Sequence, residues 1–320
     1  RIVRDGSGSV LKIVEAKDAD DEVKRINEVN AGIYLFSAGH LFENLRKLSN
    51  SNAQGEYYLT DLLGALRDAG QRVGAMIVPD PDEALGVNSR AELATVESVI
   101  QRRVVQRLMS EGVTFRNPGT VVIDSTVAIG NDTVVYPFVT LEGRTTIGSG
   151  CVIEPGVHLR DVVVGNDVHL KTGTVAEESE IADEAAVGPY AHLRAGTKLG
   201  PSVKIGNFVE TKKAVFSKGA KASHLSYIGD ADIGADVNIG AGTITCNYDG
   251  VRKNKTILED GVFIGSDTQL VAPVRVGRGA YVGAGSTITK DVPPDALAIS
   301  RTPQKVVEGW AVRKRGERKK

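Results

Sequence analysis

The residues of this chain that can do chemistry are concentrated in one segment, which begins at His224 and ends at Gly250. The segment holds one His with Tyr and Asn side chains, and it is followed directly by three cations: Arg252, Lys253 and Lys255. Further cations lie upstream, at Arg194, Lys212 and Lys213. One His can accept or release a proton near neutral pH, while Arg and Lys bind anions. The combination indicates a site for an anionic sugar or a cofactor phosphate, with one proton transfer.

These residues lie within a six-residue repeat that extends from about Ile123 to Ile288. An aliphatic residue occupies every sixth position in three runs, which start at Ile123, Ile181 and Leu258, and Gly often follows it. A period of six fits neither the 3.6 of a helix nor the alternation of a half-buried strand. It fits a solenoid in which each hexad forms a short strand and a corner. The repeat predicts a mainly β protein built on a parallel β-helix.

The phase of the hexads slips at two places, around Lys212–His224 and at Thr245–Thr256. A slip in a solenoid is expected to expel residues as a loop, and loops on a rigid scaffold commonly carry functional sites. We therefore expect the site to lie at these two interruptions.

The composition limits the class of protein. The net charge of −1 gives no sign of nucleic-acid binding, and 41% hydrophobic residues are enough for a large core. Two distant Cys, no secretion signal and no long apolar span predict a soluble, cytoplasmic protein with no membrane segment. The chain begins at Arg1 in mid-pattern and without Met, so we expect a fragment of a longer protein.

Residues 1–88 follow a different pattern, which predicts part of an α/β domain. We expect strands within 1–14, at Ala31–Phe36 and at Val73–Val78, and helices at His40–Leu48 and Leu59–Ala69. Residues 89–112 are predicted to form a linker helix with a capping box from Ser89 and Glu92. The β-helix domain with its C-terminal tail then occupies residues 113–320. The basic run at the end of that tail is expected to be solvated or to bind phosphate.

Three longer strings carry a resemblance to a known family: His224–Gly250, Gly265–Gln269 and Ala298–Arg301. Across its whole length the chain resembles the bifunctional N-acetylglucosamine-1-phosphate uridyltransferase/glucosamine-1-phosphate acetyltransferases of bacteria. The resemblance implies a left-handed β-helix, a homotrimer, and transfer of the acetyl group of acetyl-CoA to the amine of glucosamine 1-phosphate. The complete enzyme would also transfer UMP from UTP, making UDP-N-acetylglucosamine for cell-wall synthesis.

The resemblance also assigns roles to individual residues. His224 matches the catalytic base, and a base is needed because an ammonium cannot attack a thioester. The sugar phosphate would be held by Arg194, Lys212, Tyr227 and Asn238, with Lys253 as a further contact. Acetyl-CoA would be held by Ala241, Asn247, Tyr248, Ser266, Ala284 and Arg301. Asn247 would also polarise the thioester carbonyl. Trp310 is either a packing anchor or part of a neighbouring subunit's acetyl-CoA site.

In residues 1–88, Glu15 and Asn30 match contacts to UTP or its sugar product, and Asn88 matches a ligand of Mg²⁺. The Gly-rich phosphate loop, activating Lys and metal-binding Asp that the family carries have no match in this chain. One Asn cannot hold Mg²⁺, which takes several oxygen ligands. We therefore expect this chain to lack uridylyl transfer.

Three other functions stay open at this stage. A hexapeptide carbonic anhydrase needs three His ligands for zinc, whereas the His residues here are scattered along the chain. A non-catalytic assembly protein would not need the His, Asn, Tyr and Lys side chains at the second slip. A different sugar acyltransferase on the same fold is distinguished only by its substrate. His40, His158, His169 and His192 are expected to be structural or exposed.

Overall fold

The computed structural model describes residues 1–317. Of the predicted basic run, Arg313, Lys314 and Arg315 are described, and Arg318, Lys319 and Lys320 lie outside the described residues. The chain divides into two compact units, one formed by Arg1–Glu97 and the other beginning at Ser98.

The first unit contains a small hairpin and short helices. Strands β1 (Ile2–Arg4) and β2 (Val10–Ile13) pair in an antiparallel way. The helices are α1 (Asp21–Lys24), α2 (Ala38–Leu45), α3 (Asp61–Asp68) and the 3₁₀ turn η1 (Pro81–Ala84). Ile2, Val10 and Ile13 form its small core.

Two strands predicted in this unit are wrong. Neither 31–36 nor 73–78 is a strand, and the side chains of Leu35 and Met76 are 100% and 88% exposed. A strand is stable only when a neighbouring strand satisfies its backbone N–H and C=O groups. Within the described residues of this unit, the β1–β2 hairpin is the only sheet, so neither segment has such a neighbour.

Helix α4 (Arg90–Ser110) leads into the β-helix. Its predicted capping box is confirmed: the Glu92 N–H donates to Ser89 Oγ at 3.2 Å, and the Glu92 carboxylate accepts from the Asn88 N–H at 2.6 Å. Val104, Val105 and Leu108 pack into the core of the second unit. This end of α4 covers the first coils, whose apolar interior would otherwise meet water.

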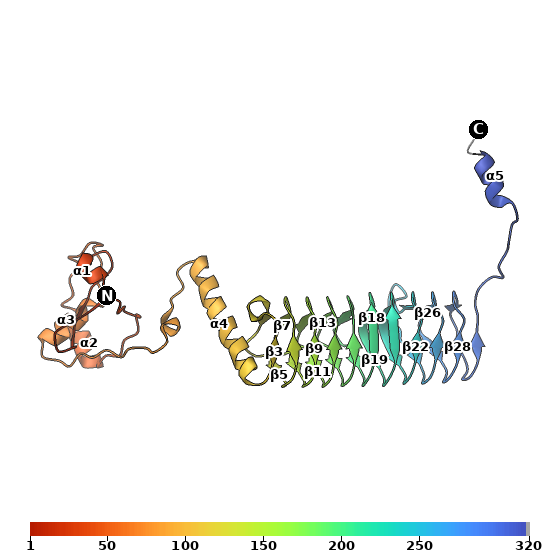
Figure 1. Cartoon of the computed structure of the whole chain (residues 1–320), viewed down its shortest axis with the longest axis horizontal. Coiled ribbons are helices and arrows are strands. Elements are labelled where there is room, and N and C mark those ends of the chain that lie inside the picture. Colours follow the sequence, from red (N-terminus) through yellow and green to blue (C-terminus); the bar gives the residue numbers. More distant parts are fainter. Residues whose placement is uncertain (318–320) are drawn as a thin grey trace. The chain divides into compact units, whose positions relative to one another are not determined.

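The second unit is a three-faced parallel β-helix, with its coils stacked along one axis from yellow to blue in Figure 1. Face 1 consists of β3 (Thr114–Phe115), β6 (Val134–Val135), β9 (Val152–Ile153), β12 (His169–Leu170), β15 (Ala186–Val187), β18 (Lys204–Asn207), β20 (Lys221–His224), β22 (Asn238–Ile239), β25 (Phe263–Ile264), β28 (Tyr281–Val282) and β30 (Leu297–Ala298).

Face 2 consists of β4 (Val122–Ile123), β7 (Thr140–Glu142), β10 (His158–Arg160), β13 (Val175–Glu177), β16 (His192–Arg194), the first halves of β19 (Glu210–Phe216) and β21 (Tyr227–Ile233), β23 (Ile244–Cys246), β26 (Gln269–Val271) and β29 (Thr287–Ile288). Face 3 consists of β5 (Ala128–Ile129), β8 (Thr146–Ile147), β11 (Val163–Val164), β14 (Glu180–Ile181), β17 (Lys198–Leu199), the second halves of β19 and β21, β24 (Thr256–Leu258) and β27 (Val274–Val276). The 3₁₀ turn η2 (Pro118–Thr120) precedes β4, and α5 (Trp310–Glu317) lies in the tail.

Each strand pairs in parallel with the strand one coil away, which confirms the predicted parallel β-helix. Leu141 pairs with Leu159, and Leu159 pairs with Ala176, so equivalent positions stack in columns. The hexad residues point inward and are almost fully buried, as at Ile123, Leu141 and Leu193. Burying such a side chain contributes about 1.5–3 kcal/mol.

The two phase slips have different structural outcomes. The second forms the predicted loop, since residues 247–255 lie between β23 and β24. The loop predicted at the first slip is wrong, because β19 and β21 each run unbroken from face 2 to face 3. These strands turn at Lys213 and Asp230, whose φ angles are 47° and 46°. Here the coils are shortened by one residue, so nothing is expelled.

Two buried Thr side chains near the loop differ in their hydrogen bonding. Thr245 Oγ1 accepts from the Gly229 N–H at 2.7 Å and lies 3.0 Å from the Gly229 carbonyl oxygen. Thr256 is equally buried, but its hydroxyl has no hydrogen-bond partner in the described part of the chain. A hydroxyl that is buried without a partner has lost its hydrogen bonds to water and gained none in the protein, which destabilises the folded state.

We predict that Thr256→Val leaves the stability unchanged or raises it by about 1 kcal/mol, because Val keeps the shape and removes the unpaired hydroxyl. Thr245→Val is the matched control and should lower the stability by about 1–3 kcal/mol, because it leaves the Gly229 N–H unpaired. The urea midpoints of the three proteins measure the effect. A Thr256→Val protein less stable than the Thr245→Val protein would contradict the assignment.

Candidate functional site

His224 is the last residue of β20 and lies where the chain leaves face 1 for face 2; we call this corner line the 1–2 edge. Its side chain is exposed, and its Nδ1 lies 2.7 Å from Oδ1 of Asn207, the register partner one coil earlier. An amide oxygen only accepts hydrogen bonds, so in this arrangement Nδ1 carries the proton and Nε2 keeps a free lone pair. The sequence reasoning missed Asn207, which could have been found one coil, or seventeen positions, before His224.

The 1–2 edge also carries most of the residues that the resemblance assigns to acetyl-CoA. Backbone hydrogen bonds join the successive coils there: Gly242 to Leu225 at 3.0 Å, Asp267 to Ala241 at 2.7 Å and Gly285 to Ser266 at 2.8 Å. Arg301 donates a side-chain hydrogen bond to the Ala284 carbonyl oxygen. His224, Ala241, Ser266, Ala284 and Arg301 therefore form one line, which spans four coil steps or roughly 19 Å at ~4.8 Å per step.

Three cations gather on face 2. Arg194 and Lys212 are register partners on adjacent coils, and Lys253 reaches Lys212 from the 247–255 loop. The charges of Lys253 and then Arg194 lower the pKa of Lys212. Arg194 pairs with Glu210 at 2.7 Å, but neither Lys212 nor Lys253 has a carboxylate at ion-pair distance among residues 1–317. Unneutralised positive charge of this kind attracts phosphate.

The hydroxyl of Tyr227 and the side-chain amide of Asn247 both lie over Gly229. Gly229 is the register partner of Lys212. A Cβ on Gly229 would lie 2.6 Å from the Tyr227 hydroxyl and 2.7 Å from Asn247 Nδ2. Only Gly therefore leaves room for both polar groups at this point. Asn247 is 7% exposed, and its Nδ2 also donates to an Asp230 carboxylate oxygen at 2.6 Å.

The 247–255 loop is internally hydrogen bonded. The Asp249 carboxylate accepts from the N–H groups of Val251 and Arg252 at 2.8 and 2.6 Å and from Asn254 Nδ2 at 2.9 Å. These hydrogen bonds lower the pKa of Asp249. Tyr248 is exposed and forms an antiparallel bridge with Lys253, while its hydroxyl donates to the Gly250 carbonyl oxygen at 2.6 Å.

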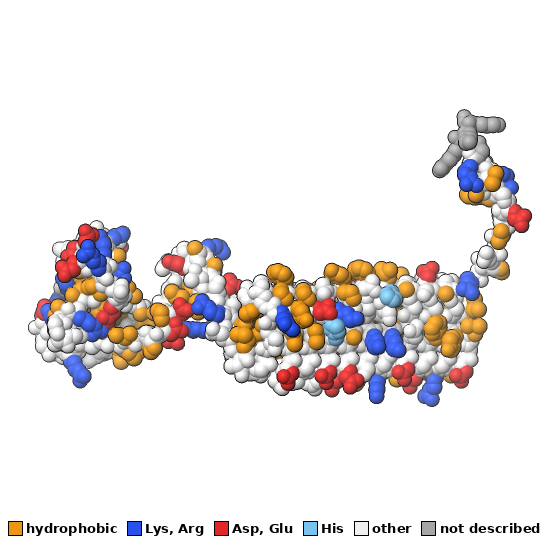
Figure 2. All heavy atoms as spheres, viewed as in Figure 1, with side chains coloured by type: hydrophobic (Ala, Val, Ile, Leu, Met, Phe, Trp, Pro, Cys, Tyr) orange, Lys and Arg blue, Asp and Glu red, His pale blue; other side chains and the backbone are white. Residues whose placement is uncertain are grey.

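Asn238 lies apart from the three cations. It begins β22 on face 1, where its register partners are Lys221 and Phe263. Within one chain, the structure therefore places Asn238 on a different face from Arg194 and Lys212. In the view of Figure 2, basic and His side chains gather over the middle coils of the β-helix, and its lower border carries Asp and Glu side chains with Lys and Arg side chains between them.

The residues assigned to the uridyltransferase make local hydrogen bonds. Glu15 accepts from the Thr60 hydroxyl at 3.2 Å, Asn30 bonds to Tyr34 and to the Gly32 N–H, and Asn88 is exposed. Over the described residues, no three His, Cys, Asp or Glu side chains are placed to hold a metal ion. The residues present do not fit a Mg²⁺ site, which needs several oxygen ligands.

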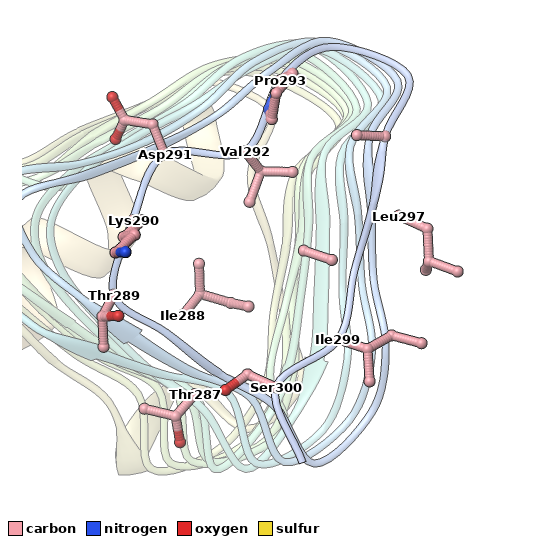
Figure 3. Close-up of a pocket in the computed structure, with 12 residues that line it drawn as sticks. Thr287, Ile288, Thr289, Lys290, Asp291, Val292, Pro293, Leu297, Ile299 and Ser300 are labelled. Atoms are coloured by element: carbon pink, nitrogen blue, oxygen red, sulfur yellow. The ribbon is translucent and has the colours of Figure 1, made fainter.

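A hollow at the C-terminal end of the β-helix is unrelated to these residues. Figure 3 shows Ile288 and Val292 pointing into the interior of the last coil, with Thr289, Lys290 and Asp291 around the rim. Up to residue 317 no later coil covers this end, so the hollow is the open end of the stack. None of the described helices has both the length and the apolar composition to cross a membrane.

A comparison with protein families agrees with the six-residue repeat. A family model described as bacterial transferase hexapeptide (six repeats) matches residues 126–161 and 255–290. The solved UDP-N-acetylglucosamine acyltransferase of Arabidopsis is 20% identical and covers 62% of this chain and 76% of its own, with a TM-score of 0.44.

Two relatives are much more similar. The bifunctional protein GlmU of Trichlorobacter lovleyi is 53% identical over 315 residues, which cover 98% of this chain and 68% of that protein. The GlmU of Syntrophotalea carbinolica is 56% identical over 313 residues, covering 98% and 67%. Identity at this level over nearly the whole chain confirms the predicted family and its left-handed β-helix. This chain belongs to the family of bifunctional GlmU proteins.

Proposed function

We propose that this chain transfers the acetyl group of acetyl-CoA to the amine of glucosamine 1-phosphate, giving N-acetylglucosamine 1-phosphate. One observation carries the proposal. Arg194, Lys212 and Lys253 form an anion site beside Tyr227, the first residue of β21, and β20 ends just before it at His224. Membership in the GlmU family supports the same activity. The pair of cations without carboxylate partners, Lys212 and Lys253, suits the phosphate of the sugar better than a neutral sugar.

His224 acts as the general base. Its Nε2 accepts a proton from the ammonium of the sugar, and the amine nitrogen then attacks the carbonyl carbon of the thioester. The new C–N bond forms and the nitrogen releases its remaining excess proton to solvent. The C–S bond then breaks, and the protonated His224 gives its proton to the departing thiolate, so that CoA leaves as the thiol. Asn207 contributes because its Oδ1 accepts the hydrogen bond from Nδ1–H of His224, with 2.7 Å between the two heavy atoms. This hydrogen bond keeps the lone pair of Nε2 directed outward.

The resemblance assigns to Asn247 the stabilisation of the oxyanion that develops on the thioester oxygen; within one chain Asn247 lies at the corner between faces 2 and 3, across face 2 from His224. One of its two amide hydrogens is held by Asp230, so the orientation of the amide is fixed before the substrate arrives. A donor that needs no reorientation during the reaction is worth more than a mobile one. This role for Asn247 follows the resemblance and the fixed position of its side chain.

The line along the 1–2 edge supports a binding path for acetyl-CoA. Ala241, Ser266 and Ala284 are small residues, so an extended pantetheine arm can lie against them with its thioester towards His224. Arg301, at the far end of the line, would then meet a phosphate of CoA.

We also propose that the active unit is a trimer of this chain. Tyr190, Phe208 and Leu225 occupy the 1–2 edge on three successive coils, with side chains that are 55%, 56% and 63% exposed. Each has a positive φ, which costs roughly 1–2 kcal/mol for a residue other than Gly. These three side chains form what we call the ridge, and a second copy of the chain packed against it would bury them. It would also bring Asn238 of one copy towards the cations of the next.

We also propose a cytoplasmic location, which agrees with the kind of reaction proposed. Uridylyl transfer from UTP with Mg²⁺ belongs to the complete enzyme, and none of its steps is assigned to the residues described here.

The first prediction tests the function. The protein should release CoA thiol when given acetyl-CoA and glucosamine 1-phosphate, and much less with amino sugars that lack the phosphate. His224→Ala should lower the rate by about 10²- to 10⁴-fold, the usual contribution of a positioned base.

His158→Ala is the matched control, because His158 is also exposed and hydrogen bonded to a neighbouring coil, at 2.6 Å from Glu142. It should leave the rate unchanged. Equal rates for the wild type and His224→Ala at neutral pH would remove His224 from the mechanism. No thiol release by the wild type would overturn the proposed function.

The second prediction separates the two binding regions. Arg194→Ala and Lys212→Ala should each raise the KM for glucosamine 1-phosphate by about 10- to 100-fold, because a hydrogen bond to a charged group contributes ~1.5–3 kcal/mol. Arg301→Ala should raise the KM for acetyl-CoA instead. Steady-state kinetics with each substrate varied in turn measure both constants. All three variants impaired equally for both substrates would contradict the division.

The third prediction concerns assembly. Light scattering at micromolar concentration should give three times the mass of the chain. Phe208→Asp should shift the mass towards the monomer, because it places a charge in the ridge while Asp tolerates the positive φ. Val163→Asp, which adds the same charge to an exposed position on face 3, should not. A wild-type mass of one chain would refute the trimer.

A further inference from the structure

The 247–255 loop replaces a single corner residue. On the two preceding coils the chain turns from face 2 to face 3 at one residue, Lys213 or Asp230, each with a positive φ. On the next coil, β23 ends at Cys246 and β24 begins at Thr256, although both strands stay in register with β21. The nine residues between them therefore lie outside the stack. The Lys255 carbonyl oxygen accepts from the Val274 N–H of the next coil at 3.4 Å, and side-chain contacts add to this attachment of the loop.

Two carboxylates on β21 make those contacts. Asp230 accepts from Nδ2 of Asn247, the first residue of the loop, at 2.6 Å. Asp232 pairs at 2.6 Å with Nζ of Lys255, the last residue of the loop. Ala231 points inward and is fully buried, so the alternation of the strand directs the carboxylate of Asp232 outward, while Asp230 occupies the corner between faces 2 and 3. One strand thus holds the two ends of the loop.

The position of Lys253 depends on those two ends. The base of the loop is closed by the Asn254 N–H, which donates to the Asn247 carbonyl oxygen at 2.7 Å, and Asp249 fixes the turn. Lys253 is carried back over face 2 to a point beside Lys212. Two ammonium groups repel each other, so a loop that was free to move would take Lys253 away from Lys212. The contacts at the ends of the loop oppose that movement.

We propose that Asp230 and Asp232 are positioning residues that clamp the 247–255 loop onto β21, and thereby hold Lys253 at the phosphate site and Asn247 at the thioester. The inference rests on the proposed function for the identity of the ligand, a sugar phosphate. The clamp itself rests on the two contacts and on the register of β21, β23 and β24.

Asp232→Asn is the sharpest test, because it keeps the size of the side chain and removes the charge that holds Lys255. The KM for glucosamine 1-phosphate should rise about threefold, as expected for an exposed ion pair. The KM for acetyl-CoA and kcat should stay within about twofold. Glu180→Gln is the matched control: Glu180 forms a similar exposed pair with Lys198 on face 3, at 2.7 Å, away from the loop. It should change none of these constants.

Two further variants separate positioning from general damage. In Asp230→Asn the new residue tolerates the positive φ, so only the charge at Asn247 is lost. Combined with Asp232→Asn it should raise the KM for the sugar phosphate by about tenfold. Asp232→Lys combined with Lys255→Asp restores an ion pair of opposite direction, and should reverse most of the rise in KM that either single change causes.

A second measurement does not depend on activity. Backbone amides of residues 248–254 should exchange with deuterium faster in Asp232→Asn than in the wild type, while the thermal midpoint and the exchange of β21 stay unchanged. Exchange and KM both at wild-type values would overturn the clamp. Absence of acetyl transfer in the wild type would overturn the proposed function alone, because the exchange of the loop still decides whether the clamp exists.

Discussion

Parallel hydrogen bonding between successive coils is the constraint on which the rest of this structure depends. Each strand must satisfy the backbone groups of the strand one coil away, so every coil has to repeat the shape of the one before it. The inward column through Leu141, Leu159 and Ala176 shows the result, with one aliphatic or small residue of the column on each coil. Because the interior is determined in this way, only the outward positions are free to carry chemistry.

The same constraint brings residues that are far apart in the sequence into contact. Residues seventeen or eighteen positions apart become neighbours, as Asn207 and His224 do on face 1 and Arg194 and Lys212 do on face 2. A site on this fold is therefore a set of adjacent columns rather than a pocket. The one hollow that Figure 3 shows, at the open end of the stack, has no part in it.

The period of six was enough to predict the β-helix and its buried residues, because burial on this fold depends on the sequence pattern alone. The partners of site residues were not predictable in the same way. Asn207 and Asp230 act on residues that lie on adjacent coils, and their positions depend on whether a coil has seventeen residues, eighteen or a loop. The strands expected at 31–36 and 73–78 failed for a related reason, since a strand depends on a partner that its own sequence does not contain.

Repulsion between Lys212 and Lys253 shows how this scaffold serves the proposed reaction. The charges of Lys253 and then Arg194 lower the pKa of Lys212, because neighbouring cations repel its ammonium group. In a flexible protein the ammonium groups of Lys212 and Lys253 would move apart. Here Lys212 belongs to a strand bonded on both sides, and Lys253 belongs to a loop held at both ends by carboxylates of β21. The unfavourable arrangement therefore persists until an anion enters, and the relief of repulsion then adds to the binding of the phosphate.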